Sequence, residues 1–210
     1  MKDKSIFKKL AEKYPTPLGV QKFLRTLDYN SADTMFSAAT VIEKGRAHCM
    51  EAAMCASAIL EHQGYPPLVI SFESVDDLDH VIAVFQGPTG WGAVGRSRDH
   101  GLHGRRPIFR SLRDLAQSYM EPYVDKTGRV EAFGVAHLDD SGVDWRWTSG
   151  NVWAAEKFLI DFPGKIVLHQ SCAKGVGRIV EGAGNGDIEG GNGFFSICLC
   201  VSFQGDSVFQ

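Results

Sequence analysis

The segment from Gly45 to Pro67 constrains this chain most, because it reads as one helix with a marked beginning and end. Small and apolar residues recur on one face of that helix: Cys49, Ala52, Ala53, Ala56, Ile59 and Leu60. This spacing buries one side of a helix, and the small side chains allow close packing. Gly64, followed by two prolines, is a typical helix stop. The pattern therefore places Cys49 in the first turn of a buried helix.

Short runs typical of β-strands follow the helix. Residues 68–72 and 81–85 are rich in β-branched and aromatic side chains. Residues 86–90 have turn chemistry and precede a third run at 91–98. We expect the second and third runs to form a hairpin.

The predicted hairpin would bring a histidine and an aspartate close together. If its turn centres near Pro88, His80 faces a residue near Arg96. Gly95 and Asp99 share one face of the returning strand, because side chains alternate. Asp99 is then expected to be a diagonal neighbour of His80.

Further elements carry local start signals. Thr16 followed by Pro17 predicts a helix start, and Ser111 is the expected cap of a helix that reaches Tyr119. Residues 129–138 alternate like a strand. Residues 151–160 have helical spacing, with Ser149 as the expected cap.

The composition changes near Gln170. Residues 173–193 hold eight of the 23 glycines and few apolar residues, a composition that cannot bury a core. We therefore expect one domain at 1–170 and a Gly-rich, flexible tail at 171–210. Within that tail, 194–203 combines high β-propensity with no charge and no proline, which predicts an edge strand or an aggregation-prone segment.

Charge and hydropathy exclude some classes of partner. The net charge of −3 and a pI near 6.2 give no electrostatic basis for binding nucleic acid. No apolar run approaches the ~18 residues of a membrane span. The charged N-terminus lacks the features of a secretory signal. Five cysteines without a regular framework fit a reducing compartment, so we expect a cytoplasmic protein.

Cys49, His80 and Asp99 follow the order nucleophile, base and orienting carboxylate. Partial positive charge at a helix N-terminus stabilises a thiolate, which favours Cys49 as a nucleophile. Each residue also has an ordinary structural interpretation. Free cysteine is usually a small buried hydrophobe, a histidine at a strand start is often half-buried and satisfied, and Asp99 has arginines nearby for a salt bridge.

Two other groups of polar side chains lie close together along the chain. His48, Glu51 or Ala52, and Cys55 share a helical face, but they offer at most three ligands without a known metal motif, so no metal is expected. The segment 96–106 holds four arginines and two histidines and could bind an anionic substrate group, or could be a solvated loop.

At these residues the chain resembles the transglutaminase-like branch of the papain-like superfamily. The matching features are the cysteine at the start of an Ala-rich helix, a strand, the strand start at Asp79-His80-Val81, a turn, and a strand that begins at Trp91 and leads to an acidic residue. They cover about residues 35–106.

The resemblance implies an α+β fold in which the cysteine helix packs on an antiparallel sheet that carries His and Asp. It also implies Cys–His–Asp chemistry on amides or acyl donors, without a cofactor. The oxyanion donors would be the Cys49 backbone N–H and an upstream group not identified from the sequence. One departure stands out, because Gly95 occupies the position, four after Trp91, where the family usually has its acid.

The sequence thus predicts a cysteine-dependent acyl-transfer enzyme, which hydrolyses or transamidates a peptide, protein or small amide. The expected catalytic residues are Cys49, His80 and Asp99, and the expected substrate-binding residues are Trp91, Arg96 and Arg98. The alternative is a catalytically silent fold of the same kind that binds a peptide or protein, and Gly95 favours it. The sequence gives no oligomeric state.

Overall fold

The computed structural model describes residues 3–74, 79–120 and 130–167. The α-helices are α1 (Ile6–Lys13), α2 (Pro17–Thr26), α3 (Ala38–Lys44), α4 (Cys49–Glu61), α5 (Leu112–Gln117) and α6 (Trp153–Ile160). The strands are β1 (Asp28–Tyr29), β2 (Arg46–Ala47), β3 (Leu68–Ser74), β4 (His80–Gly87), β5 (Gly90–Val94), β6 (Arg105–Phe109), β7 (Val130–His137) and β8 (Ile166–Val167). Two short 3₁₀ helices, η1 (His100–Leu102) and η2 (Leu138–Ser141), complete the described elements.

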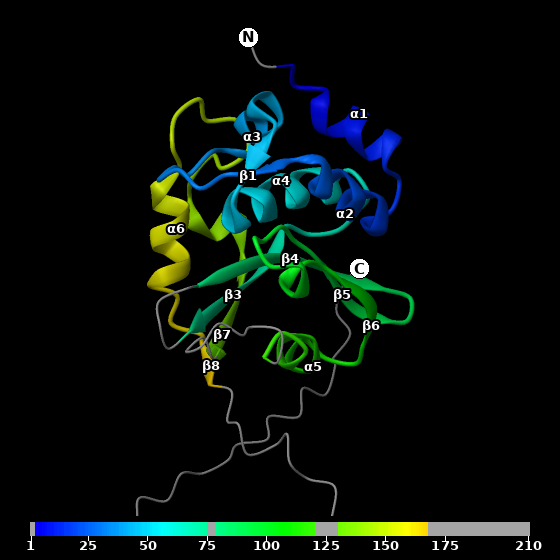
Figure 1. The fold of residues 1–210 in the computed structure, drawn as a ribbon, viewed down its shortest axis with the longest axis vertical. Coiled ribbons are helices and arrows are strands. Elements are labelled where there is room, and N and C mark those ends of the chain that lie inside the picture. The colour runs from blue at the N-terminus through cyan, green and yellow to red at the C-terminus, as the bar shows by residue number, and fades with distance from the viewer. Residues whose placement is uncertain (1–2, 75–78, 121–129, 168–210) are drawn as a thin grey trace, which may run out of the picture. The chain divides into compact units, whose positions relative to one another are not determined.

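The main sheet has the strand order β6-β5-β4-β3-β7-β8, and all its neighbouring strands are antiparallel. Helices α1 to α4 lie on one side of this sheet and α5 on the other (Figure 1). Strands β1 and β2 form a separate parallel pair. The structure confirms the predicted α+β architecture, in which N-terminal helices and a cysteine-bearing helix pack on an antiparallel sheet.

Both faces of the sheet are buried. Along β4, Val81, Ala83 and Phe85 belong to the core that includes α4. Ile82 and Val84 alternate with them and belong to the core on the α5 side. This alternation follows from the two-residue period of a strand. The sheet therefore fixes the position of α4 through a continuous apolar layer.

Most predicted helix boundaries are confirmed. Thr16 Oγ1 accepts a hydrogen bond from Gly19 N at 3.1 Å, with Pro17 as the first helical residue. Ser111 caps α5 in the same way. The expected cap at Ser149 is wrong, because α6 begins at Trp153 with Val152 as its N-cap.

The hairpin β4–β5 forms with a shifted register and a shorter second strand than predicted. Ala83 pairs with Val94, and this register, continued to His80, would reach Ser97 and not Arg96. Strand β5 ends at Val94, so Asp99 lies outside the pairing altogether. The chain leaves the sheet here because Gly95 makes its hydrogen bonds with a helix residue described below.

The predicted domain edge near Gln170 and the predicted tail at 171–210 lie outside the described residues. Among the described helices, none is both long and apolar enough to cross a membrane.

Candidate active site

Cys49 is the first residue of α4, and His48 is its N-cap. Cys49 is partly buried, whereas residues 50–60 of the helix are all buried. The backbone N–H groups in the first turn of a helix have no intrahelical acceptor and carry partial positive charge. Negative charge on the sulfur is therefore stabilised at this position.

Two imidazoles act on the Cys49 thiol. Burial alone would raise its pKa, but hydrogen bonds from His48 and His80, together with the charges of both rings, lower it to about 5. His48 precedes the cysteine in the chain, whereas His80 comes from the start of β4. At neutral pH the sulfur is therefore held as a thiolate between two histidines.

His80 is oriented by a backbone carbonyl. Its Nε2 lies 2.9 Å from the Leu102 carbonyl oxygen. A carbonyl oxygen only accepts, so Nε2 carries the ring proton and Nδ1 is the nitrogen that can take the thiol proton. His80 is 2 % exposed, and its ring stacks on Phe72, with Tyr119 beside it.

Asp99 does not take the orienting position that the sequence suggested. It is exposed and is the N-cap of η1, and its backbone N–H donates to Ser97 Oγ. Among the described residues, the hydrogen-bond acceptor that His80 Nε2 uses is Leu102 O. A peptide carbonyl thus stands where a carboxylate was expected.

The loop that supplies this carbonyl is fixed by Gln21 of α2. Gln21 Oε1 accepts hydrogen bonds from Gly95 N at 2.9 Å and Gly104 N at 3.0 Å, and its Nε2 donates to Gly95 O at 2.9 Å. Tyr119 Oη donates to the carbonyl of His103 at 3.0 Å. Both ends of the loop between β5 and β6 are therefore held, and the Leu102 carbonyl with them.

Arg105 adds a third restraint on the same loop. Its guanidinium donates to the carbonyl oxygens of Gly101 at 2.7 Å and His103 at 2.9 Å, and it lies over the Tyr119 ring. A guanidinium with several fixed acceptors holds backbone geometry well.

Gly95 leaves no room for an acidic side chain. A Cβ at this position would lie 2.9 Å from Ile82 Cγ2, in the core on the α5 side. Ile82 is β-branched and fully buried, so it cannot easily move aside. The position that the sequence resemblance assigns to an acid is therefore sterically closed in this chain.

His48 is held in place by contacts of its own. Its Nε2 lies 2.7 Å from the Thr34 carbonyl oxygen and 3.4 Å from Glu51 Oε1. As for His80, donation from Nε2 to a carbonyl leaves Nδ1 as the basic nitrogen. Burial lowers the pKa of His48, but the neighbouring thiolate, Glu51 and the Thr34 carbonyl raise it above its ordinary value.

Glu51 is a fully buried carboxylate with a complete set of donors. Its Oε1 accepts from Thr34 Oγ1 at 2.7 Å and Phe36 N at 2.8 Å. Its Oε2 accepts from Asn30 Nδ2 at 2.9 Å and His48 N at 3.0 Å. With two hydrogen bonds on each oxygen, the group is bound as a carboxylate, and it fixes the segment around His48.

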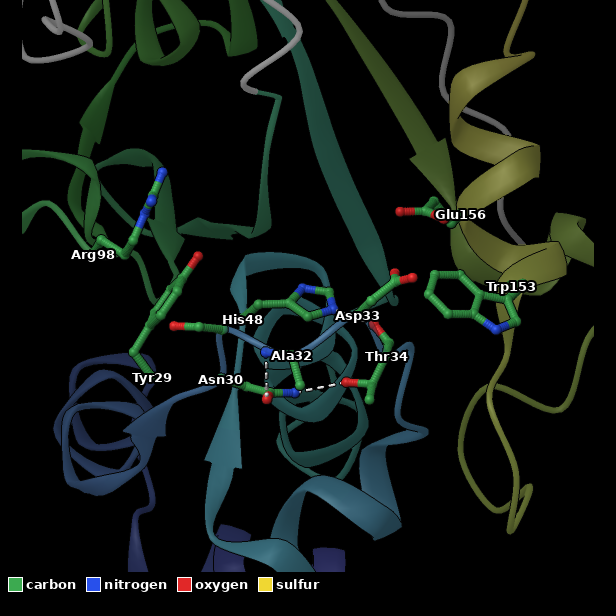
Figure 2. Close-up of a pocket in the computed structure, with 10 residues that line it drawn as sticks. Tyr29, Asn30, Ala32, Asp33, Thr34, His48, Arg98, Trp153 and Glu156 are labelled. Atoms are coloured by element: carbon green, nitrogen blue, oxygen red, sulfur yellow. Dashed lines mark hydrogen bonds between the residues drawn. The ribbon is translucent and has the colours of Figure 1, made fainter.

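A pocket of about 280 Å³ opens beside His48. In Figure 2, Tyr29 and Arg98 lie on one side of the imidazole, and Asp33, Trp153 and Glu156 lie on the other. The rest of the wall comes from the segment Asn30–Thr34. The pocket thus has a cationic side and an anionic side, with an imidazole between them.

Tyr29, upstream of Cys49 in the chain, interacts electrostatically with the thiol. Strand β1 pairs Tyr29 with Ala47, two residues before Cys49. Burial and then the charge of the Cys49 thiolate raise the pKa of Tyr29, and Arg98 and Arg96 oppose this rise. The phenol therefore keeps its proton at neutral pH and remains a hydrogen-bond donor in the wall of the pocket.

The predicted site residues are thus only partly brought together. Cys49 and His80 meet, and Arg98 lines the pocket, whereas the Arg96 guanidinium contacts Ser97 and His103. Trp91 pairs with Gln86, six residues along β4 from His80. At about 3.4 Å per residue that is roughly 20 Å away, so Trp91 is not beside the thiol.

Sequence reasoning missed His48, Tyr29 and the Leu102 carbonyl. The signal for His48 was its place directly before Cys49, at the N-cap, but the sequence interpretation considered it only as a metal ligand. Over the described ranges, no three His, Cys, Asp or Glu side chains come together in a way that could hold a metal ion.

No protein-family model matches the chain, and no curated protein matches it. One similar solved structure is EGTA-treated LapG of Legionella pneumophila, at 15 % identity and a TM-score of 0.35. The match covers 73 % of this chain and 78 % of that one. A likeness at this level says nothing about activity.

Proposed function

We propose that the protein is a cysteine-dependent acyl-transfer enzyme of the transglutaminase-like kind, which hydrolyses or transamidates an amide. The observation that carries the proposal is Cys49 at a helix N-terminus between two imidazoles, each with its Nε2 bound to a backbone carbonyl. A thiolate with a nearby acid–base group is the requirement for acyl transfer.

In the proposed reaction the Cys49 thiolate attacks the substrate carbonyl. The oxyanion accepts hydrogen bonds from the Cys49 backbone N–H and from Tyr29 Oη, which is the upstream donor that the sequence did not identify. His80 Nδ1 holds the thiol proton and gives it to the leaving amine, whereupon the C–N bond breaks and a thioester remains. Leu102 O keeps the ring in the tautomer that this transfer needs.

The substrate is proposed to be a peptide, protein or small amide that reaches the thiol through the pocket beside His48. Arg98 on one wall, and Asp33 and Glu156 on the other, favour groups of opposite charge at the two sides. No cofactor is required by this chemistry, and a cytoplasmic location remains an expectation from the sequence.

The test is acylation by p-nitrophenyl acetate. We expect a burst of p-nitrophenol with one acetyl group per chain, mapped to Cys49 by mass spectrometry, and no burst in Cys49→Ala. Adding dansylcadaverine then distinguishes transamidation from hydrolysis, because a transferase passes the acetyl group to the amine and a hydrolase passes it to water. A burst of equal size in Cys49→Ala would refute the proposal.

A specific observation favours the alternative, a silent binding module. The acid of the family pattern is missing at Gly95, and His80 is oriented by a neutral carbonyl. The same assay separates the two functions, because a binding module gives no acetyl-Cys49 faster than the unfolded chain does.

A further inference from the structure

The two imidazoles at Cys49 have different surroundings. His80 is enclosed between Phe72, Tyr119 and the β5–β6 loop, and the residue is 2 % exposed. His48 lines the pocket, and its side chain is 17 % exposed. A molecule that enters from solvent therefore meets His48 first.

The two rings also differ in the charge of the groups that their Nε2 atoms contact. His80 Nε2 donates to the neutral Leu102 carbonyl. His48 has both the Thr34 carbonyl and the Glu51 carboxylate within 3.4 Å of its Nε2. A carboxylate stabilises the imidazolium that forms when the ring takes a proton, whereas a carbonyl mainly fixes the tautomer.

We propose that His48, supported by Glu51, is the base that activates the acyl acceptor. His80, in contrast, takes the thiol proton and gives it to the leaving group. The inference rests on the proposed function, because it assigns the second half of that reaction. His48 touches the reacting atoms and is therefore a second catalytic histidine of the site.

A water molecule in the pocket gives one proton to His48 Nδ1, and its oxygen attacks the thioester carbonyl of acyl-Cys49. The tetrahedral adduct collapses, the C–S bond breaks, and the sulfur leaves with the electron pair as a thiolate. The proton on His48 then passes by way of Sγ to His80, which restores the starting state. An amine acceptor follows the same course.

Acylation itself prepares His48 for this role. The thiolate is a main cause that raises the pKa of His48, and the thioester removes that charge. In the acyl-enzyme, burial still lowers the pKa of His48, and fewer groups remain that raise it. The groups that face the ring in the acyl-enzyme are Glu51 on α4, Asp33 in the loop after β1, Glu156 on α6, and Tyr29 and Arg98 on the far wall. Loss of the thiolate charge therefore lowers the pKa of His48 relative to the free enzyme, which favours the neutral ring that can take a proton from the acceptor.

The experiment measures acylation and deacylation separately. Acetyl-enzyme made with p-nitrophenyl acetate is freed of reagent, and loss of the acetyl group is followed by intact mass. His48→Gln keeps an N–H that can donate to Thr34 O, and because it removes one hydrogen bond to the thiolate, its burst should slow, but by much less than its deacylation. Its deacylation should slow by about 10²-fold or more, the usual contribution of a general base.

His80→Gln is the matched control, since it should slow the burst instead. If the two variants lose the same half-reaction, or if His48→Gln deacylates at the wild-type rate, the assignment is wrong. Wild-type enzyme that gives no acetyl-Cys49 overturns the proposed function and, with it, this inference. The two failures are therefore distinguishable.

A second measurement needs no variant. Diethyl pyrocarbonate modifies accessible histidines, so on wild-type acetyl-enzyme it should reach His48 through the pocket but not the enclosed His80. Deacylation should then fall in proportion to His48 modification mapped by mass spectrometry. Deacylation that persists with His48 fully modified would overturn the inference.

Discussion

Alkylation of Cys49 by iodoacetamide across pH tests how far the two imidazoles and the helix N-terminus activate the thiol. The pKa of Cys49 is lowered from 9.0 to about 5. The rate should therefore be nearly constant above about pH 6 and fall to half its plateau near pH 5, because only the thiolate reacts. An ordinary thiol is still gaining reactivity at pH 8.

The rate advantage of Cys49 over an ordinary thiol depends on pH, and this dependence decides at which pH the two should be compared. At pH 7 the thiolate fraction exceeds that of an ordinary thiol by roughly 100-fold, but a pKa lower by four units also reduces nucleophilicity by about 60-fold. The net advantage at pH 7 is thus only about two-fold. At pH 5 the fraction differs by roughly 5,000-fold, so Cys49 should react about 80-fold faster than the ordinary thiol.

The assay is competitive labelling with mass-spectrometric quantification of the Cys49 peptide, in folded protein and in protein unfolded in urea. The unfolded chain supplies the ordinary thiol with the same neighbouring residues. Buried Cys55 is an internal control, because burial raises its pKa to about 12. A folded-state profile with its midpoint at pH 8 or above would refute the activation argument.

Other predictions concern single groups around the thiol. Tyr29→Phe should lower the acylation rate with p-nitrophenyl acetate by up to ~10²-fold while iodoacetamide labelling is unchanged, since only acyl transfer develops an oxyanion. Gly95→Asp should lower the free energy of unfolding by about 1–3 kcal/mol in urea titration, because its Cβ meets Ile82 Cγ2, whereas Gly150→Ala, with open space around it, should change little. Glu51→Ala should cost about 3–5 kcal/mol in the same titration, because it leaves four donors without their acceptor. Truncation after Gln170 should leave a folded domain with unchanged Cys49 labelling, and unfolding would show that the predicted domain edge is wrong.

The helix at Cys49–Glu61 could be predicted because its signals are local. An apolar face of small residues, a glycine stop and two prolines are all within one segment. The strands β3 and β4 were recognisable for the same reason, since β-branched runs between turn residues need no information from elsewhere in the chain. The register of the β4–β5 hairpin was harder, because a one-residue error in the turn centre shifts every pair.

Of the two histidines at the thiol, only His80 was predicted from the sequence as a partner of Cys49. His80 followed from its place at a strand start, but its acceptor is a main-chain oxygen, which leaves no mark on the pattern of side chains. That oxygen is held in place through Gln21, 74 residues before Gly95 in the chain. An orienting carboxylate was therefore sought at Asp99, at the end of the strand predicted from Trp91, although Asp99 lies outside that strand in the structure.

The position of negative charge explains why the proposed reaction uses both histidines. Ile82 closes the end of β5 to an acidic side chain, so the His80 side of the site has a carbonyl and no charge. The carboxylate is on the other side, where Glu51 in the first turn of α4 is already fixed by four donors and lies 3.4 Å from His48 Nε2. In the proposed reaction, the attack of water or an amine on the thioester therefore uses the ring that faces the pocket and has the Glu51 carboxylate beside it.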